Sequence, residues 1–243
     1  MQSEQQRRAA LAAMGIVEWL PRDFADQPEP AAQPLATMDE DALQTSAGAL
    51  EAGPGIDALD WPELAQEVAG CRRCGLHQGR TRTVFGVGNR SAEWMIIGEA
   101  PGQEEDRKGE PFVGRAGQLL NAMLLALGEP RDRVFIANIL KCRPPNNRDP
   151  SAEEAAACAP FLARQIALVQ PRIILCVGRI AAQTLLATTT PIGKLRGQRH
   201  VWGPRQIPVV VTYHPAYLLR SPGEKRRAWA DLCLARRTLA NGA

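Results

Sequence analysis

The stretch WMIIGEAPGQEED, residues 94–106, decides the fold of this chain of 243 residues. Its opening, WMIIG at 94–98, is short, apolar and rich in isoleucine, without clean alternation of apolar and polar positions. Such a run is typical of a strand that is buried on both faces. The continuation, GEAPGQEED at 98–106, is a polar turn rich in glycine. A buried strand followed by such a turn indicates a β–α unit.

The same pattern recurs three more times along the chain. The further apolar runs are VFIANI (134–139), RIILCV (172–177) and PVVVTY (208–213). Helical stretches are predicted between and after them, at 116–127, 151–169, 178–187 and 224–239. Repeated units of this kind predict an α/β fold in which helices cover both faces of a parallel sheet.

The first sixty residues differ from the rest of the chain. Residues 4–20 have an apolar side, so we expect 1–20 to hold a helix that docks on a replication or repair protein or folds back on the domain. Residues 21–60 are rich in Pro, Ala, Gly, Asp and Glu and show no sustained period, which predicts an acidic disordered linker. The folded domain is then expected over residues 61–243.

Composition limits where the protein works. Hydrophobic residues make up 45% of the chain, and no apolar run reaches the ~18–20 residues that cross a bilayer. The first twenty residues have neither an uninterrupted apolar stretch nor a small-residue cleavage site, so no signal peptide is expected. We therefore expect a cytoplasmic protein with no membrane partner. We also expect it to be a monomer.

Charge is distributed unevenly behind a net value of +3. Residues 1–60 contain 3 basic and 11 acidic residues, a net of −8, so the remainder carries a net of +11. A basic domain behind an acidic arm indicates a polyanionic partner for the domain. The alternative is a solvated surface with an acidic linker.

Four cysteines have the number and type of ligands that a metal centre requires. Cys71 and Cys74 form C-x-x-C, and Cys142 and Cys158 follow with fifteen residues between them. In a reducing compartment such thiols bind metal more often than they form disulfides. Four thiolates suit either a tetrahedral zinc or an iron–sulfur cluster, and the spacing alone does not decide between them.

Polar groups follow the predicted strands, where ligands bind in parallel sheets. The turn after the first strand contains Glu99, Ala100, Pro101 and Gly102. Its small residues let the backbone approach a ligand closely, and the Glu99 carboxylate can orient water or stabilise a cation. The turn matches neither a dinucleotide fingerprint nor a P-loop, so a phosphate site is not predicted there. The alternative is a turn with a structural role only.

Two residues have the chemistry that recognises a nucleobase. Phe112 lies among glycines in GEPFVGRAG, which fits a ring that stacks on a base. Asn138 interrupts an apolar strand, and its amide offers a donor and an acceptor for a base edge. The alternatives are a core anchor and a structural asparagine with satisfied hydrogen bonds.

The segment HPAYLLR, residues 214–220, combines a histidine with a bulky loop. His214 can donate a hydrogen bond to a developing oxyanion or act as an acid or base. Tyr217, Leu218 and Leu219 stand beside Arg220, and apolar wedges next to a cation are used to open a base step. The alternative is a loop that packs on the last helix.

These motifs together resemble the family 4 uracil-DNA glycosylases over about residues 64–240. The resemblance is carried by GEAPGQEED, by PFVGRAGQLL (111–120), KCRPPNNRDP (141–150) and HPAYLLR in this order, and by the spacing of the cysteines. It implies a three-layer α/β sandwich with a four-stranded parallel sheet between helices. It also implies a [4Fe–4S] cluster on the four cysteines. Family 5 enzymes have a first motif of the GLAPA type, whereas this chain has GEAPG.

The resemblance implies hydrolysis of the bond between uracil and deoxyribose in DNA, which initiates base excision repair. Uracil would be flipped out of the helix, bound by residues 99–102, Phe112, Asn138 and His214, and released with help from Glu99 and His214. Tyr217, Leu218 and Arg220 would contact the DNA. We expect the cluster to act as a staple within a basic, phosphate-binding surface. The residues expected to form that surface are Arg72, Arg73, Lys141, Arg143 and Arg148. The competing classes are a non-catalytic iron–sulfur module that binds DNA and a zinc-stabilised nucleotide-binding domain.

Overall fold

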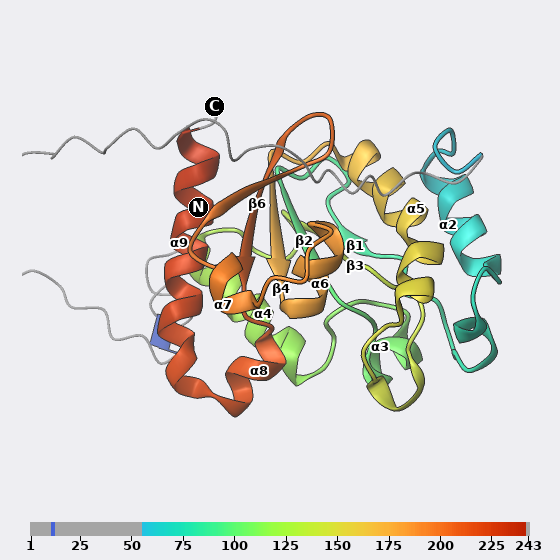
Figure 1. Cartoon of the computed structure of the whole chain (residues 1–243), viewed down its shortest axis with the longest axis horizontal. Coiled ribbons are helices and arrows are strands. Elements are labelled where there is room, and N and C mark those ends of the chain that lie inside the picture. The colour runs from blue at the N-terminus through green and yellow to red at the C-terminus, as the bar shows by residue number, and fades with distance from the viewer. Residues whose placement is uncertain (1–10, 13–54, 242–243) are drawn as a thin grey trace, which may run out of the picture.

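The computed structural model describes residues 11–12 and 55–241, which form an α/β domain of three layers (Figure 1). The predicted docking helix over 1–20 lies outside the described residues except for 11–12, which are helical. The predicted linker lies outside them up to residue 54. Its last residues are ordered, since Ile56 is buried in the core and Asp60 caps the first long helix.

One mixed sheet of six strands forms the middle layer, in the order β1-β3-β2-β4-β6-β5. The strands are β1 (Val87–Gly88), β2 (Trp94–Gly98), β3 (Phe135–Asn138), β4 (Ile173–Val177), β5 (Arg199–Trp202) and β6 (Ile207–Thr212). The four predicted strands are the inner four, and they run parallel. The prediction of a four-stranded sheet is wrong because β1 and β5 add antiparallel edges.

The edge strands lack the apolar signal that identifies the inner ones. β1 has only two residues, one of which is Gly88. β5 has the sequence RHVW and alternates between exposed and partly buried positions. An antiparallel edge strand is covered on one side only, so its sequence does not form the apolar run of a buried parallel strand.

One face of the sheet is covered by α2 and α5, with α6 and α7 further along. Their bounds are α2 (Trp61–Gly70), α5 (Ala152–Val169), α6 (Arg179–Leu185) and α7 (Ile192–Leu195). Apolar side chains from these helices pack on alternate residues of the strands, such as Ile97 and Ala137. Asp60 and Ser151 are the N-cap residues of α2 and α5, and each forms a capping box.

The opposite face is covered by α4, α8 and α9, and Figure 1 shows α9 and α5 on opposite sides of the sheet. The bounds are α4 (Arg115–Leu127), α8 (Pro215–Arg220) and α9 (Lys225–Asn241). Leu11 is buried in the same cluster as these helices. The remaining helical turns are α3 (Gln103–Lys108), η2 (Gly75–Gln78), η3 (Pro145–Asn147) and η4 (Pro222–Glu224). None of the described helices is long and apolar enough to cross a membrane.

The register of the inner strands brings the polar segments together. Gly98 pairs with Asn138 at the ends of β2 and β3, and Val177 pairs with Thr212 at the ends of β4 and β6. His214 follows Thr212 by two residues. The turn after β2, the end of β3 and the start of α8 therefore meet at one edge of the sheet, as parallel topology predicts.

Candidate active site

A cleft of about 820 Å³ lies at the carboxyl ends of the parallel strands. It collects residues that are far apart in the sequence. Of the residues predicted for the site, those that line it are Glu99, Ala100, Pro101, Gly102, Phe112, Asn138, His214, Tyr217 and Arg220. The structure therefore brings together the groups expected to bind a base and those expected to contact DNA, with the exception of Leu218.

Asn138 lines the cleft with an unpaired side-chain oxygen. Its side chain is 2% exposed, and Oδ1 has no hydrogen-bond partner within residues 11–12 and 55–241. Buried polar atoms are nearly always paired, so an unpaired acceptor that lines a cleft is ready for a ligand donor. Gly98 makes room for it, because a Cβ at that position would collide with Asn138 Oδ1 and with the Phe112 ring.

Phe112 is held in the cleft by a constrained loop. Its backbone is left-handed, with φ of 53°, which is uncommon for an aromatic residue and indicates a conformation imposed by its surroundings. Glu105 Oε1 accepts from the backbone N–H groups of Val113 at 3.0 Å and Gly114 at 3.2 Å. On the other side, Arg131 donates to the carbonyl oxygen of Pro111 at 2.6 Å.

The ring of Phe112 is stacked near His214, with ring centroids 5.7 Å apart and planes inclined by 30°. His214 is the N-cap residue of α8, and its Nδ1 accepts from the backbone N–H of Ala216 at 3.1 Å. The pKa of His214 is lowered to about 4, mainly by burial and in part by the positive charge of Arg220. At neutral pH the imidazole is therefore neutral, with its proton on Nε2, where it can donate to an oxygen in the cleft.

Glu99 is the titratable carboxyl group of the turn after β2. Its pKa is raised to about 7, mainly by burial and also by the charge of Asp149, while the charge of Arg179 opposes the shift. Asp149 and Arg179 form an ion pair of 2.7 Å at the rim of the same cleft. A carboxyl group with a pKa near neutrality can change its protonation state during a reaction, which is the property of a general base.

The prediction that Leu218 contacts DNA is wrong, because Leu218 is a core residue. It is 1% exposed and packs in the core cluster of α4 and α9, so it does not face the cleft. Its neighbour Leu219 is 37% exposed, and Tyr217 and Arg220 line the cleft. The helical turn of α8 explains the difference, because successive residues of a helix point in different directions.

Glu105, Asp149, Arg179 and Tyr213 also line the cleft and were not predicted as site residues. The signal for Glu105 was present, since an acidic run in the turn after β2 begins a helix. Arg179 follows the end of β4, where the rule of carboxyl ends applies. For Asp149, the sequence contains no pattern that would pair it with Arg179, because thirty positions separate the two residues.

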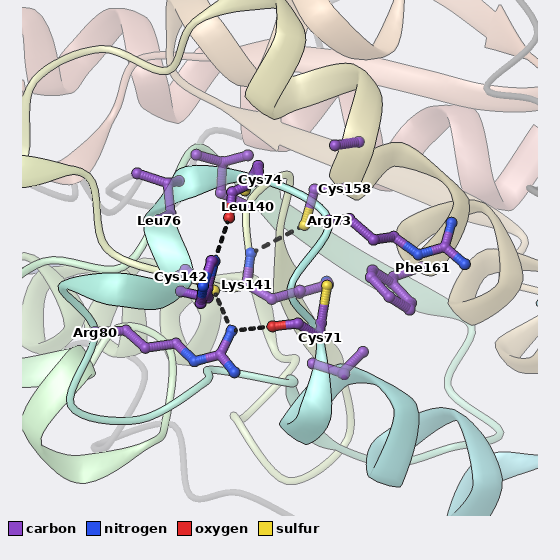
Figure 2. A pocket seen from close by; sticks show the side chains of 13 residues that line it. Cys71, Arg73, Cys74, Leu76, Arg80, Leu140, Lys141, Cys142, Cys158 and Phe161 are labelled. Atoms are coloured by element: carbon purple, nitrogen blue, oxygen red, sulfur yellow. Dashed lines mark hydrogen bonds between the residues drawn. The ribbon is translucent and has the colours of Figure 1, made fainter.

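The four predicted cysteines line one small pocket between η2, the loop after β3 and α5 (Figure 2). Arg80 donates to Cys142 Sγ at 3.2 Å, and the backbone N–H of Lys141 donates to Cys158 Sγ at 3.3 Å. Within the described residues no three His, Cys, Asp or Glu side chains close on a single metal ion. Four thiols that share one pocket are a donor set that suits a metal centre.

Lys141 does not belong to the basic surface that was predicted around the cysteines. Its side chain is 1% exposed, and Nζ donates to the carbonyl oxygen of Asn138 at 2.8 Å and to Gln165 Oε1 at 2.6 Å. Burial lowers its pKa to about 8, while the cysteine charges of Cys158 and Cys142 oppose that shift. Arg148 is also engaged, in two hydrogen bonds to Glu154.

The fold and the cleft define an α/β protein that binds a ligand beyond the carboxyl ends of its parallel strands. Its cleft offers an aromatic ring, a buried amide and a neutral histidine donor. Residues 85–234, more than half of the chain, match the Uracil DNA glycosylase superfamily. The chain belongs to this superfamily, as the motifs predicted.

Individual relatives indicate which branch of the superfamily the chain resembles. The type-4 uracil-DNA glycosylase of Archaeoglobus fulgidus is 45% identical over 174 residues, which is 69% of this chain and 86% of that protein. The corresponding proteins of Sulfurisphaera tokodaii and Pyrobaculum aerophilum are 44% and 42% identical, over 70% and 72% of this chain and 80% and 93% of their own lengths. These similarities confirm the resemblance to family 4.

Proposed function

We propose that this protein is a uracil-DNA glycosylase, which hydrolyses the N-glycosidic bond between uracil and deoxyribose in DNA. The observation that carries the proposal is the unpaired Oδ1 of Asn138 in a cleft that also contains Phe112 and His214. The similarity to type-4 uracil-DNA glycosylases supports the same assignment.

Recognition of uracil follows from the chemistry of the cleft. The base is flipped out of the duplex at a cost of a few kcal/mol, because its glycosidic bond is inaccessible in the stack. Phe112 stacks on the base. Asn138 Oδ1 accepts from N3–H while the amide nitrogen donates to O4, and cytosine presents the reverse pattern at these positions. The same amide therefore binds uracil and rejects cytosine.

Bond cleavage moves negative charge onto uracil and positive charge onto the sugar. His214 Nε2–H donates to uracil O2 as charge develops there, and one such donor typically contributes about 3–4 kcal/mol. Backbone N–H groups of residues 99–102 supply further donors. The Glu99 carboxylate orients the water that adds to C1′ and stabilises the cationic sugar.

We assign the contacts with DNA to residues of α8. Leu219 replaces Leu218 as the residue that fills the gap left by the flipped base, because it is the exposed member of the pair. Tyr217 lines the cleft beside it, and Arg220 is placed to bind a backbone phosphate. The net positive charge of the domain favours the same partner.

The residues of the cysteine pocket fit a [4Fe–4S] cluster, which Cys71, Cys74, Cys142 and Cys158 would hold. When bound, the cluster links four thiolates of distant segments, and glycosidic hydrolysis requires no electron transfer from it. Arg80 and the Lys141 N–H would donate to its cysteine sulfurs. The cluster has a structural role in this proposal.

We propose that the protein acts as a monomer in the cytoplasm, and that residues 4–20 serve as a docking segment for another protein. Leu11, within that segment, is buried against the α4 and α9 cluster, which favours a segment that also contacts its own domain.

A duplex oligonucleotide with one uracil, incubated with purified protein and then treated with alkali, tests the function. We expect strand cleavage at uracil and none in the matched thymine duplex. His214→Ala is expected to slow release by about 10²–10³-fold while DNA binding remains. Binding without cleavage by the intact protein would instead identify a non-catalytic DNA-binding module.

A further inference from the structure

Lys141 is an unusual residue, because a charged side chain that is 1% exposed needs a reason to be buried. It occupies the sequence position before Cys142, and its backbone N–H donates to Cys158 Sγ, as Figure 2 shows. Its Nζ donates a hydrogen bond to the carbonyl oxygen of Asn138, three residues earlier in the chain. One residue therefore contacts both the cysteine pocket and the backbone of the amide that faces the cleft.

Among the described strands, none pairs with the carbonyl of Asn138. β1 pairs with β3 only at Phe135 and Ile136, so the paired region of β1 does not extend along β3 as far as Asn138. The backbone N–H of Ile139 donates to Gly98 O, which places that residue's hydrogen-bonding groups toward β2. Because these groups alternate along a strand, the Asn138 carbonyl faces the side where β1 has ended. Lys141 Nζ supplies the donor that a longer β1 would have supplied.

A chain of hydrogen bonds then anchors Lys141 to the helical layer. Gln165 Oε1 of α5 accepts from Lys141 Nζ at 2.6 Å, and Gln165 Nε2 donates to the carbonyl oxygen of Phe85 at 2.8 Å. The carbonyl oxygen of Lys141 accepts from the backbone N–H of Val84 at 2.8 Å. The end of β3 is thus fixed to α5 and to the segment before β1 through two buried polar side chains.

We propose that Lys141 is a positioning residue for Asn138, which holds the base-reading amide in register by bonding the Asn138 carbonyl and Gln165. The inference rests on the proposed function, since it names what orients the uracil-binding group. Asn138 Oδ1 stays unpaired until the base arrives, so the side chain gains no orientation from a hydrogen bond of its own oxygen. Its placement depends on the backbone and on packing against Gly98 and Phe112.

Lys141→Met tests the proposal, because Met has similar length but cannot donate. We expect the single-turnover rate of uracil release to fall about 10- to 100-fold, as for a misplaced reacting group. The dissociation constant for DNA with an abasic-site analogue should change less than about threefold, since a buried side chain reaches no phosphate. Arg164→Met is the matched control. It removes a neighbouring hydrogen bond of α5, to Leu59, and should leave the rate unchanged.

The double variant Lys141→Met with Asn138→Ala separates positioning from general damage. If Lys141 acts through Asn138, the double variant releases uracil as slowly as Asn138→Ala alone, within about threefold. If the rate in the double variant instead falls by the product of the two single-variant factors, the proposal is overturned. Loss of iron from Lys141→Met at the level of a cysteine variant would also overturn it, because Lys141 would then serve the cluster.

Amide hydrogen exchange gives a result that does not depend on glycosylase activity. In Lys141→Met we expect faster exchange at Ile139 and Leu140, whose N–H groups donate to Gly98 O and Glu99 O, with unchanged exchange in α9. Unchanged exchange at these two amides would overturn the proposal. If the wild-type protein released no uracil, the proposed function would fail and the exchange result would still decide whether Lys141 fixes the end of β3.

Discussion

Asn138 shows how a single residue trades stability for recognition. Its Oδ1 is buried without a partner in the part of the chain that the structure describes, which is unfavourable for folding. The cost is tolerated because a ligand donor satisfies the atom on binding. Sites that bind polar ligands commonly contain such groups, and replacing them often increases stability at the expense of activity.

Asn138→Ala therefore has opposite expected effects on two measurements. The single-turnover rate of uracil release should fall by about 10²–10³-fold, because the base loses its hydrogen bonds. The melting temperature should stay the same or rise, since the unpaired oxygen is removed.

Asn138→Asp should release cytosine measurably, because a protonated carboxyl can donate to N3 and accept from N4. Strict uracil preference in Asn138→Asp would contradict the edge-reading role.

Glu99 predicts the pH dependence of the reaction. Its pKa is raised to about 7, so the carboxylate is the minor form below pH 7 and the major form above it. If the carboxylate is the active form, kcat/KM rises about tenfold per unit below pH 7 and levels off above it. His214 does not titrate in this range, since its pKa is near 4. The measurement is kcat/KM between pH 5.5 and 8.5, a range of about three units around the raised pKa.

Two variants give the control for this profile. In Glu99→Gln, kcat/KM should be low and should no longer depend on pH in this range. Asp149→Asn should move its midpoint to lower pH, because the Asp149 charge raises the pKa of Glu99 and the Arg179 charge lowers it. A profile that keeps its midpoint in both variants would assign the titration to another group.

At the scale of elements, α5 joins the helical layer to the cysteine pocket. It begins at the capping box of Ser151 and Glu154, and it contains Cys158 and Gln165. Glu154 also accepts two hydrogen bonds from Arg148. These bonds lower the pKa of Glu154 to about 2, mainly through Arg148.

Glu154→Gln should destabilise the protein in a pH-dependent way. The folded pKa near 2 lies below the unfolded value of about 4.3, so the carboxylate contributes stability above about pH 4.3 and loses it as pH falls toward 2. Chemical denaturation at pH 6 and pH 3 should show a smaller difference from wild type at pH 3. Gln183→Ala is the control, because it removes hydrogen bonds of an uncharged side chain to Thr189 and Thr190, and its loss of about 1 kcal/mol should be similar at both values. Equal losses for Glu154→Gln at both pH values would contradict the ion pair.

Elements differ in how far their residues predict them. The inner strands were predictable because burial on both faces selects continuous apolar runs such as WMIIG and IILCV. β5 was not, because one exposed side removes that signal. Leu218 was misplaced because the direction of a side chain depends on where a short helix begins. Lys141 was expected at the surface, as most lysines are, and its buried acceptor Gln165 follows only after another twenty-four residues.

At the scale of the whole molecule, the cysteine pocket brings together segments of the chain that are not joined through the sheet. Cys71 and Cys74 follow α2, whereas Cys142 follows β3 and Cys158 lies in α5. α2 lies on α5 and contributes Leu64 and Val68 to the core below. A bound cluster would close this layer covalently, much as a disulfide closes a loop.

Cys142→Ser should therefore affect stability before chemistry. We expect loss of the visible absorbance of the cluster and a decrease of about 2–5 kcal/mol in the free energy of unfolding, similar to loss of a disulfide. Limited proteolysis should cut residues 55–80 first, because that segment is fixed through Cys71 and Cys74. Activity at low temperature should follow the folded fraction, since the cleft residues Asn138 and His214 are not ligands. Cys233→Ser, whose cysteine lies outside the pocket, should keep both cluster and stability. A cluster-free Cys142→Ser protein with full stability and full activity would refute the structural role, because nothing else in the proposal requires these four thiols.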